Sequence, residues 1–167
     1  MTLDDCERVA EIRVRGWQTA YRGLMPQSYL DALSVAEDAQ RRRERFRQSD
    51  ADVVNLVAVQ DGTLLGWAAH GPYRDGEVRT ADAELYAIYV DAGRFGGGIG
   101  HALLQESVRR CTRAGYPCVY LWVLDGNTRA RAFYERAGFH PDGAEEPFEV
   151  DGVPVPEVRY VKDLIAG

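Results

Sequence analysis

Three consecutive glycines, with a fourth two residues later, occupy the run Phe95-Gly96-Gly97-Gly98-Ile99-Gly100. The run separates a strand-like segment from a helix-like segment, and glycine costs about 1 kcal/mol in a helix interior relative to alanine. Glycine does let the backbone approach a ligand closely and adopt left-handed angles. The first turn of the following helix presents unpaired N–H groups and partial positive charge. The run therefore predicts an anion-binding loop, most often one for phosphate; the alternative is a plain flexible loop.

The spacing of these glycines excludes two familiar nucleotide-binding motifs. A dinucleotide fingerprint, G-x-G-x-x-G, would need its third glycine at His101 or at Leu103. A P-loop would need Lys and then Ser or Thr after Gly100, where the chain has His101 and Ala102. The observed G-x-G-x-G opens a helix predicted over 99–113. Backbone amides alone can hold a pyrophosphate at such a place, without a metal.

Length, charge and cysteine usage bound the class of protein. The 167 residues favour one domain spanning 1–167, and a net charge of −6 argues against broad nucleic-acid binding. No apolar run reaches the roughly 18 residues of a membrane span, and the N-terminus lacks the regions of a signal peptide. The three cysteines form no C-x-x-C motif and predict buried thiols in a reducing cytoplasm. The three histidines form no H-x-x-x-H pair, so no metal site is expected.

Hydrophobic periodicity and turn residues predict a mixed order of helices and strands. In the first half we expect helices at about 5–16, 26–33 and 35–48, strands at 52–60 and 64–70 around an Asp61-Gly62 turn, and a polar loop over 73–82. In the second half we expect a strand over 83–91, the helix over 99–113, a strand over 118–124, a helix over 128–137 ended by Gly138, and a last hairpin around Asp151-Gly152. Strand, helix and strand in the middle predict a parallel strand pair.

The strand over 83–91 carries one candidate for acid–base chemistry. Period-two alternation places Glu84, Tyr86, Ile88 and Val90 on one face. Burial would raise the pKa of the Glu84 carboxyl, and a raised pKa suits a general base near neutral pH. The alternative is a glutamate at the exposed end of a strand. Tyr86 could assist through its hydroxyl or form part of the core or a pocket wall.

The helix over 128–137 carries a second candidate. Tyr134 lies on its apolar stripe, and the hydroxyl needs a partner if it is buried. Tyr134 could donate a proton to a leaving group, or it could be a packing residue. Asn127 is the expected N-cap of this helix, a role that does not exclude ligand contact. His101, beside the glycine run, could contact a phosphate or be a surface histidine.

Several segments together resemble the GNAT superfamily of N-acetyltransferases, and the resemblance covers nearly the whole chain. Residues 84–91 followed by 96–104 look like the acetyl-CoA motif of that family, and residues 127–139 look like its second cofactor motif. Residues 17–26 are similar to one bacterial branch of small GNAT enzymes. The two motifs in this order and spacing are far more specific than the glycine run alone.

The resemblance implies a mixed α/β (α+β) GNAT fold with a mostly antiparallel twisted sheet, one splayed parallel strand pair, and helices on both faces. It implies acetyl transfer from acetyl-CoA to a primary amine of a small molecule or peptide by direct attack. Tyr134 would protonate the departing thiolate, and Glu84 would act as the base, directly or through water. A free strand amide near Ile88 or Tyr89 would stabilise the oxyanion. The cofactor-binding residues would be Ile88, Tyr89, Val90, Phe95, Gly96, Gly97, Gly98, Ile99, Gly100, His101, Asn127, Arg131 and Tyr134, with no metal.

The chain departs from the family's pattern at two places. The family usually has Arg or Gln where this chain has Phe95, so one side-chain contact to the cofactor would be missing, and the usual short first strand is absent or truncated. Two alternatives stay open: a non-catalytic acyl-CoA-binding or regulatory module, and an acyltransferase that uses a longer acyl group. A homodimer is expected by family analogy alone. Trp17, Tyr21, Tyr86 and Tyr120 are candidates for an acceptor pocket that fits a small cationic or aromatic amine, or equally a peptide N-terminus.

Overall fold

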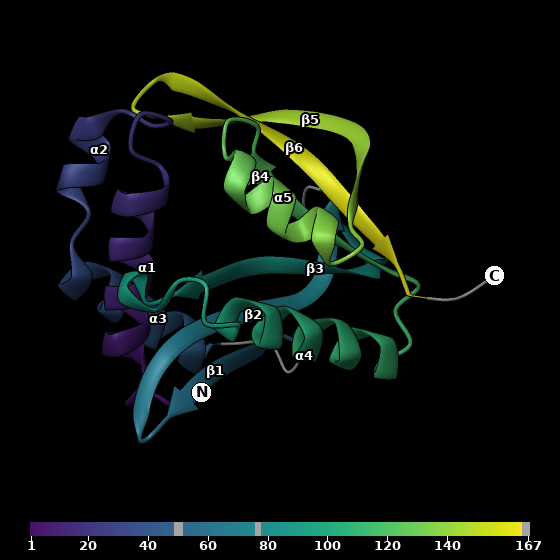
Figure 1. Cartoon of the computed structure of the whole chain (residues 1–167), viewed down its shortest axis with the longest axis horizontal. Helices are drawn as coiled ribbons and strands as arrows, with labels where there is room; N and C mark the ends of the chain where they lie inside the picture. The colour runs from purple at the N-terminus through teal and green to yellow at the C-terminus, as the bar shows by residue number, and fades with distance from the viewer. Residues whose placement is uncertain (49–51, 76–77, 165–167) are drawn as a thin grey trace.

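A computed structural model describes residues 1–48, 52–75 and 78–164 of the chain, and Figure 1 shows the arrangement of its elements. The helices are α1 (Cys6–Ala20), α2 (Gln27–Ala32), α3 (Val35–Arg47), α4 (Ile99–Arg113) and α5 (Thr128–Arg136), with a 3-10 turn η1 (Ala92–Arg94). The strands are β1 (Val54–Gln60), β2 (Thr63–Asp75), β3 (Val78–Val90), β4 (Cys118–Leu124), β5 (His140–Val150) and β6 (Val153–Asp163).

The strands form one sheet in the order β1-β2-β3-β4-β6-β5. Four of the neighbouring pairs are antiparallel, and β3 with β4 is parallel, which confirms the prediction from the strand–helix–strand order. The parallel pair is short, because only Ala83 with Val119 and Glu84 with Tyr120 are in register. Beyond Glu84 the two strands separate, as the expected splayed pair requires.

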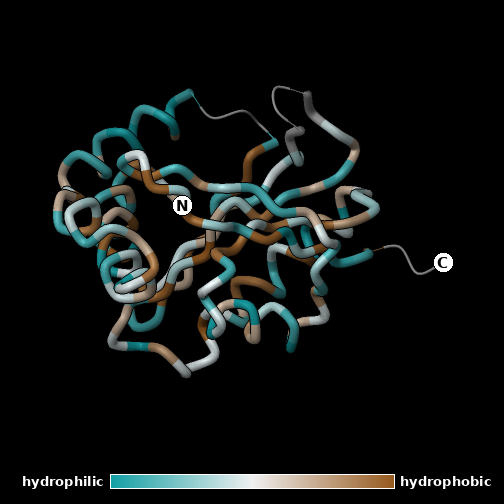
Figure 2. Tube along the Cα trace, turned by 90° about the horizontal axis from the view of Figure 1, so that it is seen from above, coloured by the Kyte–Doolittle hydropathy of each residue, from teal (hydrophilic) through white to brown (hydrophobic). Residues whose placement is uncertain are grey.

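Helices cover both faces of this sheet, and apolar side chains fill the space between the layers. One cluster joins the sheet to α4 and α5 around Leu104, Leu121 and Tyr160. Two other clusters join it to the N-terminal helices, one around Val9 and Trp67 and the other around Leu30 and Leu124. Figure 2 shows hydrophobic stretches of the strands running through the middle of the molecule, between more hydrophilic helices. The predicted mixed α/β fold with helices on both faces is confirmed.

Two local expectations are wrong in the described residues. The loop predicted over 73–82 is strand, since β2 continues to Asp75 and β3 begins at Val78; residues 76–77 lie outside the described part. The first helix continues past Gly16 to Ala20. Gly16 lies inside this helix where it packs closely on Tyr89, since a Cβ at Gly16 would lie 3.1 Å from Cδ1 of Tyr89. Asp5 is the N-cap residue of α1, and its carboxylate accepts a hydrogen bond from the backbone N–H of Thr2.

A β-bulge in β3 overturns the prediction that Glu84, Tyr86, Ile88 and Val90 share one face. Ala69 pairs with Ala87 and His70 with Leu85, so Tyr86 is an extra residue on β3. One extra residue reverses the alternation of side chains. Accordingly Tyr86 packs with the cluster under α1, whereas Ile88 packs with the cluster under α4 and α5.

The described helices include none that is long and apolar enough to cross a membrane. The three cysteines Cys6, Cys111 and Cys118 are buried and unpaired, as predicted. Before α1, residues 1–5 form a bend and a turn and contain no strand.

Candidate active site

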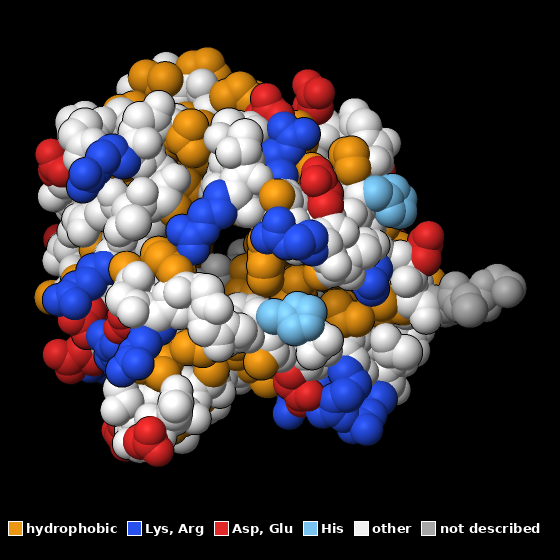
Figure 3. Space-filling view, viewed as in Figure 1, with side chains coloured by type: hydrophobic (Ala, Val, Ile, Leu, Met, Phe, Trp, Pro, Cys, Tyr) orange, Lys and Arg blue, Asp and Glu red, His pale blue; other side chains and the backbone are white. Residues whose placement is uncertain are grey.

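A cavity of about 430 Å³ opens where β3 and β4 separate, and we call it the larger cavity. Its walls come from β3, from the glycine loop and first turn of α4, and from α5. Figure 3 shows a hollow in the middle of this face, with Lys or Arg side chains and one histidine close to its edge. Among its lining residues are Ile88, Tyr89, Val90, Phe95, Gly96, Gly98, Ile99, Gly100, His101, Asn127 and Tyr134.

The glycine loop has the left-handed backbone that its sequence predicts. Gly96 has φ +83° and Gly98 has φ +79°, and Gly98 is the N-cap of α4. Glycine has no side chain to cap the helix, so the first N–H groups of α4 are left without a side-chain acceptor. Asp91 fixes the start of the loop, since it accepts from the N–H of Gly93 at 2.9 Å and pairs with Arg8 of α1. These interactions also lower the pKa of Asp91.

The β4-facing edge of β3 supplies a second backbone surface. Pairing with β4 stops at Glu84, and Leu85 to Val90 line the larger cavity instead of a neighbouring strand on that side. Backbone N–H and C=O groups on such an edge can bind an extended ligand or a developing oxyanion. This is the geometry expected for the strand around Ile88 and Tyr89.

Helix α5 places Asn127 and Tyr134 in the wall of the larger cavity. Asn127 is the N-cap, as predicted, and its side chain accepts from the N–H of Ala130 at 3.1 Å. Tyr134 is 8% exposed, and burial raises the pKa of its hydroxyl above the usual value. A phenol with a raised pKa keeps its proton at neutral pH and is therefore suited to act as a proton donor.

Aromatic side chains from α1 and β3 meet Tyr134 at the inner part of the cavity. The indole Nε1 of Trp17 donates to the hydroxyl of Tyr89 at 2.7 Å, and the hydroxyl of Tyr21 lies 3.5 Å from the same oxygen. Tyr89 is close enough to Tyr134 to contribute to the raised pKa of that residue. This cluster therefore places two further phenols, Tyr21 and Tyr89, near Tyr134.

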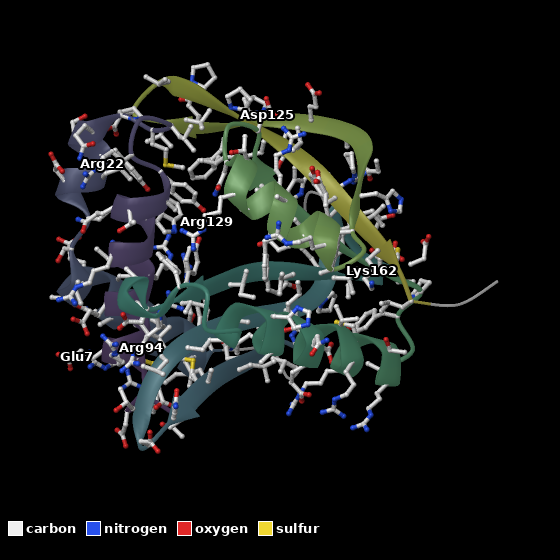
Figure 4. The ribbon with its side chains drawn as sticks, in the orientation of Figure 1. Glu7, Arg22, Arg94, Asp125, Arg129 and Lys162 are labelled. Atoms are coloured by element: carbon white, nitrogen blue, oxygen red, sulfur yellow. The ribbon has the colours of Figure 1, made fainter. Side chains whose placement is uncertain are left out.

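Three arginines line the larger cavity. Arg94, Arg129 and Arg136 are exposed residues in its lining. The guanidinium of Arg129 stacks over the ring of Phe95, 4.0 Å from the ring centroid, and Figure 4 shows Arg129 extending from α5. Phe95 therefore has no polar group of its own, but its ring holds the guanidinium of Arg129, which comes from α5, beside the glycine loop.

We expect Arg129→Ala to weaken acetyl-CoA binding about three- to fivefold at low salt, because an exposed cation contributes up to about 1 kcal/mol and salt screens it. Isothermal titration calorimetry at two ionic strengths measures this. Arg131→Ala on the same helix is the matched variant. An unchanged acetyl-CoA Kd in Arg129→Ala would contradict the role of Arg129. Weaker acetyl-CoA binding in Arg131→Ala would support the sequence prediction that Arg131 contacts the cofactor.

A second cavity of about 250 Å³ adjoins the first, and we call it the acceptor cavity. Most of its lining residues are aromatic or aliphatic, although the surface that they expose to the cavity is more polar than apolar, and two of them are carboxylate residues, Glu84 on β3 and Glu157 on β6. The predicted pocket residues Trp17, Tyr21 and Tyr86 line it, and the hydroxyl of Tyr86 donates to the carbonyl of Pro72 at 2.5 Å. Tyr120 does not line it; its ring packs on Tyr73 at a centroid distance of 4.9 Å.

Sequence reasoning missed Glu157. This residue lines both cavities, and burial, with a smaller contribution from Glu146, raises the pKa of its carboxyl to about 7. The one local signal is an acidic residue between the apolar residues Pro156 and Val158 of the strand. Its neighbours in space come from β4 and β5, which no local pattern identifies.

Most of the predicted site residues come together, and two lie apart from the cavities. Gly97 is exposed and outside the lining. The guanidinium of Arg131 points to other partners: it donates to the hydroxyl of Tyr160 at 3.0 Å and to Asp125. Glu84 lines the acceptor cavity but not the larger one. In the described residues no group of three or more His, Cys, Asp or Glu could hold a metal ion.

Known proteins resemble this chain in sequence and in fold. The family model described as "Acetyltransferase (GNAT) family" matches residues 17–139. The chain is 31% identical over 157 residues to the uncharacterized N-acetyltransferase YuaI of Bacillus subtilis, covering 93% of this chain and 86% of that protein.

Two solved structures show the similarity of fold. The PaiA N-acetyltransferase from Thermoplasma acidophilum in complex with coenzyme A has a TM-score of 0.73 and 23% identity, over 98% of this chain and 95% of that one. A ribosomal-protein-alanine N-acetyltransferase from Brucella melitensis has a TM-score of 0.75 and 22% identity, over 98% and 96% of the two chains. At this level of identity the likeness concerns the fold.

Proposed function

The chain belongs to the acetyltransferase (GNAT) family, and on this premise we propose that it transfers the acetyl group of acetyl-CoA to a primary amine. One observation carries the proposal. The larger cavity is lined by the glycine loop, by three arginines, by a buried phenol and by one carboxylate. Such a cavity suits a donor that has phosphates at one end and a thioester at the other.

The residues present fit acetyl-CoA. The N–H groups around Gly96, Gly98 and Gly100 are suited to the pyrophosphate, because two left-handed glycines expose the helix start without a Cβ in the way. Arg94, Arg129 and Arg136 supply charge for phosphates. The open edge of β3 is suited to the amides of the pantetheine arm, and Asn127 remains a proposed contact to that arm.

The proposed reaction is direct attack of the amine on the thioester carbonyl. An amide of β3 near Ile88 or Tyr89 stabilises the oxyanion, and Tyr134 donates its proton to the departing thiolate. A protonated amine is no nucleophile, so a carboxylate of the acceptor cavity must take a proton from it. Glu84 is the residue proposed from the sequence for this step, acting directly or through water, and Glu157 is the other carboxylate in that cavity.

The acceptor cavity favours a small cationic amine over a peptide N-terminus. Aromatic rings of Trp17, Trp122 and Phe148, together with two carboxylates, provide a surface that binds an ammonium group on an apolar body. Its volume of about 250 Å³ accommodates a small molecule more readily than a chain of several residues. A longer acyl group and a non-catalytic acyl-CoA-binding module are the alternatives.

We also propose that the chain acts as a single domain over residues 1–167, in the cytoplasm, with a homodimer as a further possibility. Packing of the N-terminal helices and the C-terminal strand on one sheet supports the single domain. The three unpaired thiols support a reducing compartment. Light scattering coupled to size-exclusion chromatography measures the oligomeric state.

We expect acetylation of aromatic and alkyl primary amines at a kcat/KM at least about tenfold above that of short peptides, because the acceptor cavity is small and aromatic. The assay measures free thiol release from acetyl-CoA across polyamines, arylalkylamines, amino acids, amine-bearing antibiotics and peptides. Propionyl-CoA and butyryl-CoA test the longer acyl group. Acetyl-CoA binding with no turnover of any amine would favour the non-catalytic module, and no binding would contradict the proposed function.

A further inference from the structure

Glu157 lies where the two cavities meet. It pairs in register with Leu124 of β4 on one side and with Glu146 of β5 on the other. The cavities share Tyr21, Tyr89 and Trp122 in their linings, and Glu157 belongs to both linings. Among the described residues it is the one acidic residue that lines the larger cavity, whereas Glu84 lines only the acceptor cavity.

The charges around the larger cavity are separated along its length. Arg94 ends η1 directly before the glycine loop, and Arg129 stacks on Phe95 of that loop, where phosphates are expected. Glu157 belongs to the part shared with the acceptor cavity, where a thioester would meet an amine. An acid among phosphate-binding residues would repel the donor, but an acid at this shared part attracts a cationic acceptor toward the reacting carbonyl.

The groups around Glu157 leave its carboxylate without a cationic partner. Glu146 lies beside it on β5, Glu84 and Tyr89 of β3 line the same acceptor cavity, and Tyr21 is close enough for Glu157 to raise its pKa. Among the described residues that line the acceptor cavity there is no Lys, Arg or His. In the described parts of the chain no hydrogen bond or ion pair joins Glu157 to another side chain. Burial and Glu146 raise its pKa to about 7, so at neutral pH it can both accept and release a proton.

The neighbouring phenols cannot take this role. Burial raises the pKa of Tyr21 and of Tyr134 above their usual values, so both remain protonated near neutral pH. Tyr21 lies close enough to both Tyr134 and Glu157 for each to contribute to its raised pKa. Tyr21 and Glu157 line both cavities, and Tyr134 lines the larger one close to Tyr21.

We infer that Glu157 is the catalytic base that takes the proton from the acceptor amine where the larger cavity and the acceptor cavity meet. This inference rests on the proposed acetyl transfer. Glu84, which lines the acceptor cavity alone, holds the ammonium group before the proton leaves. The assignment differs from the sequence prediction, which gave the base to Glu84.

Atoms and charge balance in this proposed reaction. The ammonium loses one proton to the Glu157 carboxylate, which passes it to solvent. The neutral nitrogen forms a bond to the carbonyl carbon, and the bond from that carbon to sulfur breaks. Tyr134 gives its proton to the thiolate, and the second proton lost by the nitrogen restores the phenol. One proton is released for each acetyl group transferred.

The test compares Glu157→Gln with Glu84→Gln as a matched pair of carboxylate-to-amide changes. For Glu157→Gln we expect an acetyl-CoA Kd within about twofold of wild type, and kcat lowered about 10²- to 10³-fold at pH 7. The wild-type rate should rise with pH through about 7, where the Glu157 carboxyl is expected to ionise. The Glu157→Gln rate should rise only toward the pKa of the free amine, about 10. Glu84→Gln should raise the KM for the amine and keep the rise of the rate near pH 7, which we call the limb near pH 7.

Thermal unfolding supplies a readout independent of activity. A carboxyl whose folded pKa lies above its unfolded value makes the protein less stable as pH rises through that range. The melting temperature of Glu157→Gln minus that of wild type should therefore be more positive at pH 8 than at pH 5. Glu157→Asp is a second variant that keeps the carboxyl, and we expect reduced kcat with the limb near pH 7 retained.

Two results would overturn the inference, and they differ from failure of the proposed function. If Glu157→Gln keeps the limb near pH 7 and full kcat, Glu157 is not the base. If Glu84→Gln loses that limb, the base is Glu84. If wild type binds acetyl-CoA but acetylates no amine, acetyl transfer itself fails and this role fails with it.

Discussion

Replacing Tyr134 by phenylalanine should lower kcat about 10²- to 10³-fold while the protein remains folded, since general-acid catalysis contributes about that much. The hydroxyl lies in the wall of the larger cavity, and burial raises its pKa. Wild type therefore retains its proton donor up to at least pH 9. Without the hydroxyl, the thiolate must leave unprotonated or take a proton from water. Thiol release at saturating substrates, measured from pH 6 to 9, records the loss.

The acetyl-CoA Kd of Tyr134→Phe should stay within about twofold of wild type, because the ring and its packing remain. Tyr29→Phe is the matched control, since Tyr29 lies in the cluster around Leu30, outside both cavities. It should leave kcat unchanged. An unchanged kcat for Tyr134→Phe at every pH would remove the general-acid role.

Gly98→Ala should weaken acetyl-CoA binding at least about tenfold, a change of about 1.4 kcal/mol. Gly98 has φ +79°, and a left-handed conformation costs a residue with a Cβ roughly 1–2 kcal/mol. A Cβ at Gly98 would meet nothing within 4 Å, so the effect comes from the backbone. Relief of this strain moves the N–H groups that open α4. Calorimetric titration with acetyl-CoA measures the binding.

Gly62→Ala is the control for backbone strain alone. Gly62 has φ +75° in the β1–β2 turn, and a Cβ there also meets nothing within 4 Å. Both variants should lose a similar part of the free energy of unfolding, measured by denaturant titration, but only Gly98→Ala should lose acetyl-CoA affinity. Equal Kd values for the two variants would show that the glycine loop is not the phosphate-binding element.

Elements that depend on local signals follow directly from the sequence. Helix α4 over Ile99–Arg113 and strand β4 over Cys118–Leu124 have the predicted bounds, because a glycine run and an apolar run mark them. The Asp61-Gly62 turn and the Asn127 cap form as expected for the same reason. The sequence shows that Phe95 departs from the family pattern. It does not show that Arg129 stacks on Phe95, because the two residues are far apart in the chain and meet only in the folded structure.

The sequence by itself determined the glycine loop, the order of strand, helix and strand, and the position of Tyr134 on an apolar helix face. Each of these depends on residues that are close together in the chain. Only the tertiary structure decided the bulge at Tyr86, the arrangement of two adjoining cavities, and the place of Glu157 between them. The register between strands and the burial of a carboxyl are set by partners far away in sequence, so no local pattern encodes them.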